Sequence, residues 1–389
     1  MKLMIILSRF PYPLEKGDKL RAFHQLKELS LNNEIYLFCV TDIKISEEQI
    51  NYVRPYCKEV KVVRLNKISI YLNLFFTLFS KKPFQVNYFF QRNAYRIFLK
   101  FVNNIKPNHI YCQMLRTTEY AKHLYHIPKT LDYMDALSKG IERRIEKTSW
   151  FLLPLFKSEY KRLRNYETII FDYFNNVTII SEQDRGYIRH PEKNKIIVVP
   201  NGIDFDFFSP IVKEKKYDLL FFGNMNYPPN IDCAVYIAEK IYPILKYNGL
   251  NLKLLIAGAT PHKKVLELNK QVDIDVIGWI DDQREVYSES RIFLAPFQIG
   301  TGMQNKLLEA MAMGLPCITT DLANNALKAV NNQEIIIANT PHEIYTSIKE
   351  LLENNDKYML ISSNARKLVE QNYSWQKQTA KLSQLFNAK

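Results

Sequence analysis

The residues best suited to chemistry in this 389-residue chain lie in one short stretch, 299–316, where a glycine-containing loop leads into a predicted helix. Gly300 and Gly302 allow the backbone to approach a phosphate closely, and the start of a helix offers free N–H groups and the positive end of a dipole. Lys306 and Glu309 follow at a spacing of three residues, which places them on one face of the helix. The lysine suits a diphosphate, and the glutamate could accept two hydrogen bonds from ribose hydroxyls. A capped surface helix with a solvated Lys–Glu pair would have the same spacing, so the spacing alone leaves both interpretations open.

The elements that must position this loop are predicted as alternating strands and helices. Short apolar runs are separated by amphipathic or polar segments such as 20–29 and 231–245, which indicates parallel sheets covered on both faces. We therefore expect an α/β protein with two doubly wound, Rossmann-like domains that face each other across a cleft, with ligands at the carboxyl ends of the strands. The predicted strands are 3–7, 35–40, 60–63, 109–112, 130–131, 177–180 and 196–199 in the first half, and 219–222, 252–257, 276–277, 292–295, 317–319 and 334–337 in the second.

The boundary between the domains is predicted at residues 200–202, where turn residues interrupt the pattern and the charge balance changes. Residues 1–199 contain 33 Lys and Arg against 19 Asp and Glu, whereas residues 200–389 contain 20 against 21. The net charge of +13 therefore arises from the first half. Such an excess favours an anionic partner, which could be nucleic acid, an anionic membrane or a phosphorylated substrate. A generally basic proteome is the alternative explanation.

Composition and motifs disfavour several other classes of protein. A hydrophobic content of 47% and a charged content of 24% are typical of a soluble globular protein, and the apolar stretch 68–80 is too short to span a bilayer. The five cysteines show no CxxC pair, which disfavours a disulfide framework or a zinc ribbon. Residues 1–8 suit a buried strand better than a signal peptide, so we expect a cytoplasmic protein.

No metal site and no nucleic-acid partner are predicted. The seven histidines are scattered, and neither an HExxH motif nor a Walker loop occurs. The acidic pairs at 204 and 206, 273 and 275, and 281 and 282 are interpreted as solvated turn and strand-end residues. A non-enzymatic nucleic-acid binder would need a recognised RNA or DNA module, and the sequence contains none.

Six motifs in a fixed order give the chain a resemblance to a known family. They lie at 8–19, 132–138, 181–185, 199–204, 222–230 and 305–314, and they read SRFPYP with GDK, DYMDALS, SEQDR, VPNGID, FGNMNYPPN and NKLLEAMAMG. Together they resemble glycosyltransferase family 4, which has the GT-B fold, and more narrowly the bacterial sugar transferases of exopolysaccharide clusters. The resemblance covers nearly the whole chain.

The resemblance implies a retaining glycosyltransferase that uses a nucleotide-sugar donor and requires no metal or other cofactor. It implies that residues 1–199 bind the acceptor, that residues 200–372 bind the donor, and that a C-terminal helix at 373–389 packs back on the first domain. The acceptor would be a glycan or a polyprenyl-linked sugar of cell-surface polysaccharide or glycolipid synthesis. Because the acceptor domain carries the positive charge, we expect peripheral attachment to the anionic inner face of the plasma membrane. A nucleotide-sugar epimerase of GT-B-like architecture is the alternative, although the carboxylate and histidine set for its ring chemistry is not found.

Carried over by position, Glu309 looks like the ribose-binding glutamate that ends the family's E-x7-E motif, whereas the opening glutamate is replaced by Thr301. Asn224 and Pro229 stand where the family often has an Arg and a Lys that grip the diphosphate. Lys306 is then the best remaining cation for the leaving phosphates, and it is a predicted catalytic residue. The donor site implied by the resemblance contains Gly17, Asp18, Asn201, Gly202, Asn224, Asn230, Gly300, Thr301, Gly302, Met303, Gln304, Asn305, Lys306 and Glu309.

Asp135 is the second predicted catalytic residue. It follows the strand at 130–131, near the place where relatives carry an acidic residue or a histidine that faces the reacting sugar. Its carboxylate could orient the acceptor hydroxyl or stabilise positive charge at the anomeric carbon. Capping of a helix that starts at residue 136 is the alternative role, and Asp132 competes with Asp135 for the catalytic one.

The loop at 9–21 resembles the family's glycine loop over the cleft. Gly17 and Asp18 would bring backbone N–H groups near the diphosphate and the acceptor. An ordinary turn with Asp18 as the N-cap of a helix from Lys19 explains the same residues, and both interpretations can hold at once. The predicted acceptor-side cations are Arg9, Lys19 and Arg21.

Overall fold

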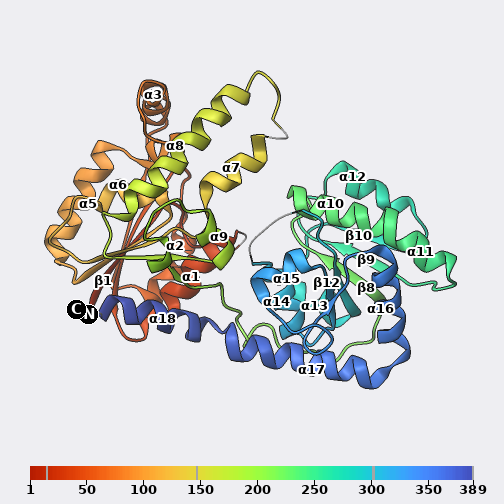
Figure 1. Ribbon diagram of the computed structural model, residues 1–389. Helices are drawn as coiled ribbons and strands as arrows, with labels where there is room; N and C mark the ends of the chain where they lie inside the picture. The colour runs from red at the N-terminus through yellow and green to blue at the C-terminus, as the bar shows by residue number, and fades with distance from the viewer. Residues whose placement is uncertain (15, 146–147, 300–302, 388–389) are drawn as a thin grey trace. The chain divides into compact units, whose positions relative to one another are not determined.

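The computed structural model describes residues 1–14, 16–145, 148–299 and 303–387, and the chain divides into two compact units (Figure 1). Unit 1 comprises Met1–Pro200 and Trp375–Lys389, and unit 2 comprises Asn201–Ser374. The sequence placed the boundary after residue 199 and assigned residues 373–389 to the first domain. Each unit is an α/β structure built on a parallel sheet.

Unit 1 contains a parallel sheet in the order β3-β2-β1-β4-β5-β6-β7. The chain runs outward from β1 to β3 and then returns to β4 on the other side of β1. The order of the sheet therefore reverses between β1 and β4, where ligands of such sheets bind beyond the carboxyl ends of the strands. The strands are β1 (Lys2–Leu7), β2 (Glu34–Thr41), β3 (Glu59–Arg64), β4 (His109–Gln113), β5 (Lys129–Asp132), β6 (Asn176–Ile179) and β7 (Ile197–Val198).

Most helices of unit 1 lie between these strands in the sequence. One further helix of unit 1 is formed by the C-terminal segment of the chain. In the C-terminal helix, Trp375 stacks on His24 with 5.0 Å between ring centres, and Phe386 packs against His109 and Tyr111. This helix therefore belongs to the core of unit 1. The helices are α1 (Gly17–Ser30), α2 (Glu47–Val53), η1 (Arg54–Tyr56), α3 (Lys67–Thr77), α4 (Phe84–Phe89), α5 (Arg92–Ile105), η2 (Leu115–Thr117), α6 (Thr118–Ala121), α7 (Leu137–Ile145), α8 (Leu153–Phe171), α9 (Glu182–Tyr187), η3 (Lys193–Lys195) and α18 (Trp375–Asn387).

Unit 2 contains a second parallel sheet, in the order β10-β9-β8-β11-β12-β13. Its order reverses between β8 and β11, because β9 and β10 extend the sheet on one side of β8 and β12 and β13 extend it on the other side of β11. The strands are β8 (Tyr217–Phe222), β9 (Leu254–Ala257), β10 (Ile274–Ile277), β11 (Ser290–Ala295), β12 (Cys317–Thr319) and β13 (Ile336–Ile337).

The helices of unit 2 include one departure from the sequence prediction. The segment 231–245, expected as one helix, is formed by α10, a π-helical turn η4 and α11, and Pro243 lies in the first turn of α11. Proline has no N–H group to donate, which interrupts the regular hydrogen-bond ladder at this point. The helices are α10 (Pro228–Tyr236), η4 (Ile237–Ile241), α11 (Tyr242–Tyr247), α12 (Lys263–Leu266), η5 (Glu267–Lys270), α13 (Gln283–Ser288), α14 (Asn305–Ala312), α15 (Asp321–Leu327), α16 (Pro341–Glu353) and α17 (Asn355–Asn372).

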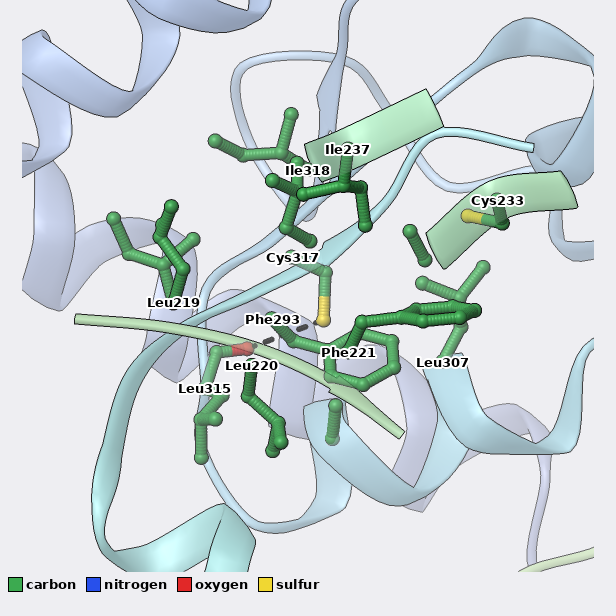
Figure 2. Close-up of a cluster of buried hydrophobic side chains, with 14 of the residues drawn as sticks. Leu219, Leu220, Phe221, Cys233, Ile237, Phe293, Leu307, Leu315, Cys317 and Ile318 are labelled. Atoms are coloured by element: carbon green, nitrogen blue, oxygen red, sulfur yellow. Dashed lines mark hydrogen bonds between the residues drawn. The ribbon is translucent and has the colours of Figure 1, made fainter. Parts of the chain in front are cut away.

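The core of unit 2 fixes helix α14 against the sheet. Figure 2 shows Leu307 of α14 among side chains of β8, β11 and β12, including Phe221, Phe293 and Ile318, all of them buried. Burying a leucine side chain contributes about 1.5–3 kcal/mol. The apolar face of α14 is therefore anchored, and this anchoring sets the direction of its polar face.

The prediction of the strands is confirmed, because each predicted strand corresponds to a strand of the structure within a few residues at its ends. Continuous apolar runs mark the central strands because both faces of a parallel sheet are covered. Within the described part of the chain, we find no helix that combines the length and the apolar character needed to cross a membrane.

Candidate functional site

Several predicted donor residues lie just beyond β8 and β11, where the sheet of unit 2 reverses its order. Gly223 and Asn224 follow β8 directly, and α14 follows the loop after β11 and carries Lys306 and Glu309. The carboxyl ends of parallel strands at such a reversal form the usual ligand site of this architecture. Of the predicted phosphate loop, Gly300, Thr301 and Gly302 lie outside the described residues.

Lys306 holds its ammonium group at a defined point of this site. Its Nζ donates to Oδ1 of Asn230 at 2.5 Å, and Nδ2 of Asn230 donates to the backbone oxygen of Asn224 at 2.8 Å. The ammonium lies 4.8 Å from the ring centre of Phe297 and 5.5 Å from that of Phe221. Burial lowers the pKa of Lys306 to about 8. The amine is therefore mostly protonated at neutral pH, and the low-dielectric surroundings strengthen its attraction for an anion.

Two glycines that the sequence prediction did not include in the site make this arrangement possible. A Cβ atom on Gly223 would lie 2.9 Å from Nδ2 of Asn230 and 3.0 Å from Nζ of Lys306. A Cβ atom on Gly258, which follows β9 with a φ of +137°, would lie 1.8 Å from the backbone oxygen of Gly223. A glycine placed directly after a buried strand is the signal that could have identified both positions.

Glu309 lies one turn after Lys306 on the same face of α14. Its Oε2 accepts a hydrogen bond from the hydroxyl of Tyr287 at 2.8 Å, and burial raises its pKa. Leu307 and Leu308, between the two polar residues, are buried in the core, which turns the polar face away from it. Tyr287, in α13, was not predicted, because nothing in the local sequence shows which residue α14 faces.

The start of α14 brings together another group of predicted donor residues. Nδ2 of Asn201 donates to Oδ1 of Asn305 at 3.2 Å, and both Asn201 and Gly202 are buried. Gln304 is the N-cap residue of the helix, and Met303 packs against the core of unit 2. The first turn of α14 contains no acidic residue, so its N–H groups and Lys306 present positive charge together.

In unit 1 the predicted loop lies at the reversal point between β1 and β4. Arg9, just after β1, forms an ion pair with Asp18 at 2.8 Å, and Nε2 of Gln113 at the end of β4 donates to the backbone oxygen of Asp18 at 3.4 Å. The interpretation of Asp18 as an N-cap is wrong, because α1 starts at Gly17 and Lys16 is its N-cap. The carboxylate of Asp18 binds Arg9 instead.

Arg21, predicted as an acceptor-side cation, is buried inside unit 1. Its side chain is 0% exposed, and its Nε donates to Oδ2 of Asp132, also 0% exposed, at 2.7 Å. Asp132 further accepts hydrogen bonds from Tyr111 at 2.8 Å and Thr178 at 3.0 Å. Burial alone would raise the pKa of Asp132, but Arg21 and these donors hold it below its ordinary value. Lys19 is also buried, whereas the side chain of Arg9 is partly exposed.

Asp135 and Asp132 occupy different environments, which separates the two candidates for one role. Asp132 is enclosed in the core of unit 1, whereas Asp135 is exposed in the loop that follows β5. The pKa of Asp135 is raised to about 7, first by loss of hydration among the surrounding protein and then by the negative charge of Asp184. A carboxyl group of this kind can exchange a proton near neutral pH.

Among the residues that the structure describes, no three His, Cys, Asp or Glu side chains group so that they could hold a metal ion. The site in unit 2 combines Lys306, Glu309, several side-chain amides and the start of α14, and the predicted site in unit 1 combines carboxylates and arginines.

Comparison with known proteins finds a family match in the second unit and two relatives of the chain. Residues 216–354 match the family Glycosyl transferases group 1. Over 97% of both chains, the protein is 24% identical to an uncharacterized 44.6 kDa protein in the cps region of Klebsiella pneumoniae. It is also 24% identical to the UDP-Gal:alpha-D-GlcNAc-diphosphoundecaprenol alpha-1,3-galactosyltransferase of Escherichia coli, over 49% of this chain and 54% of the relative.

The fold is similar to that of solved structures along the whole chain. HepE from Anabaena, in complex with UDP, superposes with a TM-score of 0.67 over 99% of both chains at 11% identity. Both parallel-sheet units are included in a match of that extent. The chain is therefore a glycosyltransferase with the GT-B fold, and its match to the family Glycosyl transferases group 1 lies within the second unit.

Proposed function

We propose that this protein transfers a sugar, with retention of anomeric configuration, from a nucleoside-diphosphate sugar to an acceptor of cell-surface polysaccharide or glycolipid synthesis. The observation that carries the proposal is the pair Lys306 and Glu309 on the polar face of α14, at the reversal point of the sheet in unit 2. The Escherichia coli relative is named for a UDP-sugar donor, HepE was solved with UDP, and the Klebsiella pneumoniae relative is encoded in a cps region.

In this proposal the donor binds at unit 2 with its diphosphate at Lys306 and its ribose at Glu309. As the bond between the anomeric carbon and the phosphate oxygen breaks, negative charge grows on the leaving diphosphate. The half-buried ammonium of Lys306 and the N–H groups at the start of α14 stabilise that charge. No metal ion is required by the proposal, because these groups supply the positive charge.

Unit 1 supplies the acceptor side of the proposed reaction. The acceptor hydroxyl bonds to the anomeric carbon from the face on which the diphosphate leaves, and its proton passes to the departing phosphate oxygen. Positioning and electrostatics therefore provide the rate enhancement. Asp135 is the residue proposed to orient this hydroxyl, because its carboxyl is exposed and its pKa of about 7 permits proton exchange. None of the three proteins named above is called an epimerase, so that alternative gains no support.

The donor is tested by measuring thermal unfolding of the protein with a panel of nucleotide-sugars that starts with UDP-sugars. A donor at 100 times its Kd should stabilise the protein by about 2.7 kcal/mol. Nucleotide-sugars whose base does not fit the site should leave the melting temperature unchanged.

Asp135→Asn should be stabilised by the same donor as the wild type but should turn it over more slowly. Lack of stabilisation by any nucleotide or nucleotide-sugar would contradict the proposal.

We also propose that unit 1 attaches reversibly to an anionic membrane surface. Exposed cations of α7 and α8, Arg144, Lys157 and Lys161, accompany the exposed aromatic residues Trp150 and Phe151. Two other basic residues near this surface are engaged within unit 1. Arg162 donates to the backbone oxygens of Thr77 and Lys82, and Lys82 pairs with Glu119 at 2.7 Å.

The membrane proposal predicts salt-sensitive co-sedimentation with anionic vesicles and weak binding to neutral ones. Each cation near an anionic surface contributes about 1 kcal/mol. The double variant Lys157→Glu/Lys161→Glu should therefore release the protein from anionic vesicles, whereas Lys100→Glu on α5 should not (Figure 1). Binding that ignores both salt and lipid charge would contradict this attachment.

A further inference from the structure

Unit 1 contains an apolar groove of about 770 Å³ that the proposed reaction does not yet use. Its walls come from α3, α7 and α8, which lie beside one another in unit 1 (Figure 1). Leu74 and Phe75 line it from α3, Ile141 from α7 and Phe156 from α8. An apolar cavity of this size, with few polar groups, suits an apolar ligand.

One of the polar groups in the groove, the guanidinium of Arg116, is only partly paired. Its Nη2 donates to Oε1 of Gln85 at 2.7 Å, and its plane lies over the ring of Phe89 at 5.3 Å. Its Nε and Nη1 are buried and have no hydrogen-bond partner. Burial, together with the positive charges of Arg9 and Arg144, lowers the pKa of Arg116 to about 10. A buried donor without a partner costs free energy that a bound anion would recover.

The carboxylates near Arg116 are already committed to other donors. Glu159 accepts from the backbone N–H groups of Phe84 and Gln85 at 2.7 and 3.1 Å. Asp42 accepts from the hydroxyl of Tyr88 at 2.7 Å, and Asp18 pairs with Arg9. Within the described part of the chain, no carboxylate lies at ion-pair distance from Arg116. Among the described residues, Asp18 and Asp42 act on Arg116 only from beyond ion-pair distance, so its charge is not directly paired.

A smaller cavity of about 290 Å³ leads from the groove toward the reversal point of the sheet in unit 1. The two cavities share Leu74, Phe84, Gln85 and Arg116, and the smaller one also includes Arg9, just beyond β1. The apolar groove therefore continues into a more polar cavity, past the partly paired Arg116, toward the loop proposed for the acceptor. A ligand that fits would have a long apolar part, an anionic group at Arg116 and a polar end near Arg9.

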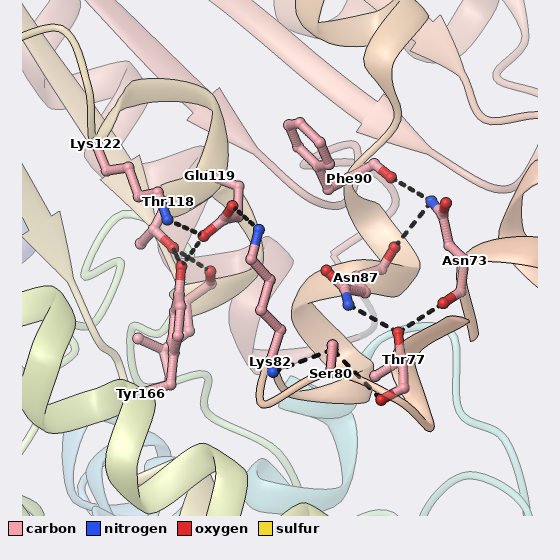
Figure 3. A network of polar contacts seen from close by, with 11 residues as sticks. Asn73, Thr77, Ser80, Lys82, Asn87, Phe90, Thr118, Glu119, Lys122 and Tyr166 are labelled. Carbon is pink, nitrogen blue, oxygen red and sulfur yellow. Dashed lines mark hydrogen bonds and ion pairs between the residues drawn. The ribbon is translucent and has the colours of Figure 1, made fainter. Parts of the chain in front are cut away.

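The outer rim of the groove is built to hold aromatic residues at the surface. Tyr71, Phe75 and Phe76 of α3 and Phe79 just after it are between 56% and 79% exposed. Figure 3 shows the polar contacts that fix this helix: Asn73 donates to the backbone oxygen of Phe90 at 2.6 Å, and Asn87 donates to Thr77 at 2.7 Å. The exposed rings thus stand on an anchored helix, and a wall of exposed aromatic residues suits contact with lipid.

We propose that this groove binds the acceptor's lipid: an isoprenoid chain lies between α3, α7 and α8, and the diphosphate that joins it to the sugar is bound by Arg116 with Arg9 and Arg144. The inference rests on the proposed glycosyl transfer and assigns the acceptor's place within it. Arg116 acts as a binding residue that sets how far the lipid-linked sugar reaches.

The test measures binding of farnesyl diphosphate, a short isoprenoid diphosphate, to the full chain by calorimetry or by competition with a fluorescent analogue. Inorganic diphosphate and farnesol are the comparison ligands, because each keeps only one half of the proposed recognition. Farnesyl diphosphate should bind at least 10-fold more tightly than either. If inorganic diphosphate bound as tightly as farnesyl diphosphate, the groove would not be the site of the isoprenoid chain. If farnesol bound as tightly as farnesyl diphosphate, the arginines would have no role in binding.

Two pairs of variants locate the binding. Arg116→Gln should lower the affinity for farnesyl diphosphate by about 10- to 100-fold, as expected for hydrogen bonds to a charged group. Arg96→Gln on α5 should leave this affinity unchanged. Gly140 of α7 lines the groove, and a Cβ atom there meets nothing within 4 Å, so Gly140→Trp should fill the groove without strain on the backbone. Gly186→Trp, at a glycine of α9 with equal space, is the matched control.

The same preparations are examined for stabilisation by UDP-sugars, which separates this inference from the proposed function. Loss of lipid binding with donor stabilisation intact supports the groove. Unchanged lipid binding in both Arg116→Gln and Gly140→Trp overturns it and leaves the transferase proposal untouched. Lipid binding without any response to nucleotide-sugars would overturn the proposed donor and not the groove. Should one variant unfold, as thermal melting would show, the other variant decides.

Discussion

Replacing Asp132 with alanine is expected to lower the free energy of unfolding of unit 1 by about 3–5 kcal/mol, because the fully buried Arg21 would lose its partner. The pair is enclosed, with both side chains 0% exposed and 2.7 Å between Nε and Oδ2. The hydroxyls of Tyr111 and Thr178 would lose an acceptor as well. Urea unfolding followed by the fluorescence of Trp375, which is buried against His24, reports on unit 1 when Trp150 and Trp279 are replaced by phenylalanine in every variant compared.

Two further variants separate the charge from the packing. A double change, Arg21→Met with Asp132→Leu, should recover much of the loss, because it removes both charges together. Arg54→Ala breaks an exposed pair with Glu47 and should cost less than about 1 kcal/mol. A small effect of Asp132→Ala, comparable to that of Arg54→Ala, would show that Arg21 is not held by this contact.

The pH dependence of this contribution has a definite sign. The pKa of Asp132 is lower in the folded protein than its ordinary value. The stabilisation is therefore fully present above an unfolded pKa of about 3.9 and is lost as the pH falls through the depressed folded pKa. Asp132→Ala should abolish this part of the acid sensitivity of unit 1.

The second large effect is expected at the donor site. Lys306→Ala should lower kcat/KM for the donor roughly 10- to 150-fold, because it removes a charge-assisted contact to the diphosphate. This factor corresponds to a loss of about 1.5–3 kcal/mol of transition-state stabilisation. Glu309→Ala should lower it by about 1–3 kcal/mol through lost hydrogen bonds to the ribose. Steady-state kinetics with the donor found by thermal unfolding measures both. Lys349→Ala, on α16, is the surface control.

The pKa of Lys306 gives this prediction a second readout. Because its pKa is about 8, the amine loses its charge as the pH rises through that value, and kcat/KM for the donor should fall above about pH 8. Lys306→Arg should keep its charge and flatten this limb of the profile. Wild-type kinetics in both Lys306→Ala and Glu309→Ala would remove these residues from the donor site.

The sequence determined features that depend on neighbours in the chain. Strand β8 could be predicted from the apolar run 219–222, because a strand buried on both faces has to be apolar along its length. The shared helix face of Lys306 and Glu309 follows in the same way from the 3.6-residue turn. These are local periods, and a single sequence contains them completely.

The tertiary structure decided which residues meet across the sheets. Arg21 and Asp132 are 111 residues apart, and Lys306 and Asn230 are 76 apart. Their contacts depend on the order of the strands, and a sequence period carries no information about that order. For this reason the sequence, which predicted Arg21 as an acceptor-side cation, could not show that it is buried against Asp132.

Arg116 is a second residue whose environment could not be predicted from the sequence. In the sequence it is one cation in a basic half-chain, without any motif around it. Only the packing of α3, α7 and α8 around an apolar groove, with each nearby carboxylate bound to another donor, leaves its guanidinium partly unpaired. The chain's composition determined that unit 1 is positive, and the fold decided at which point that charge is desolvated, because desolvation depends on what surrounds a group in space.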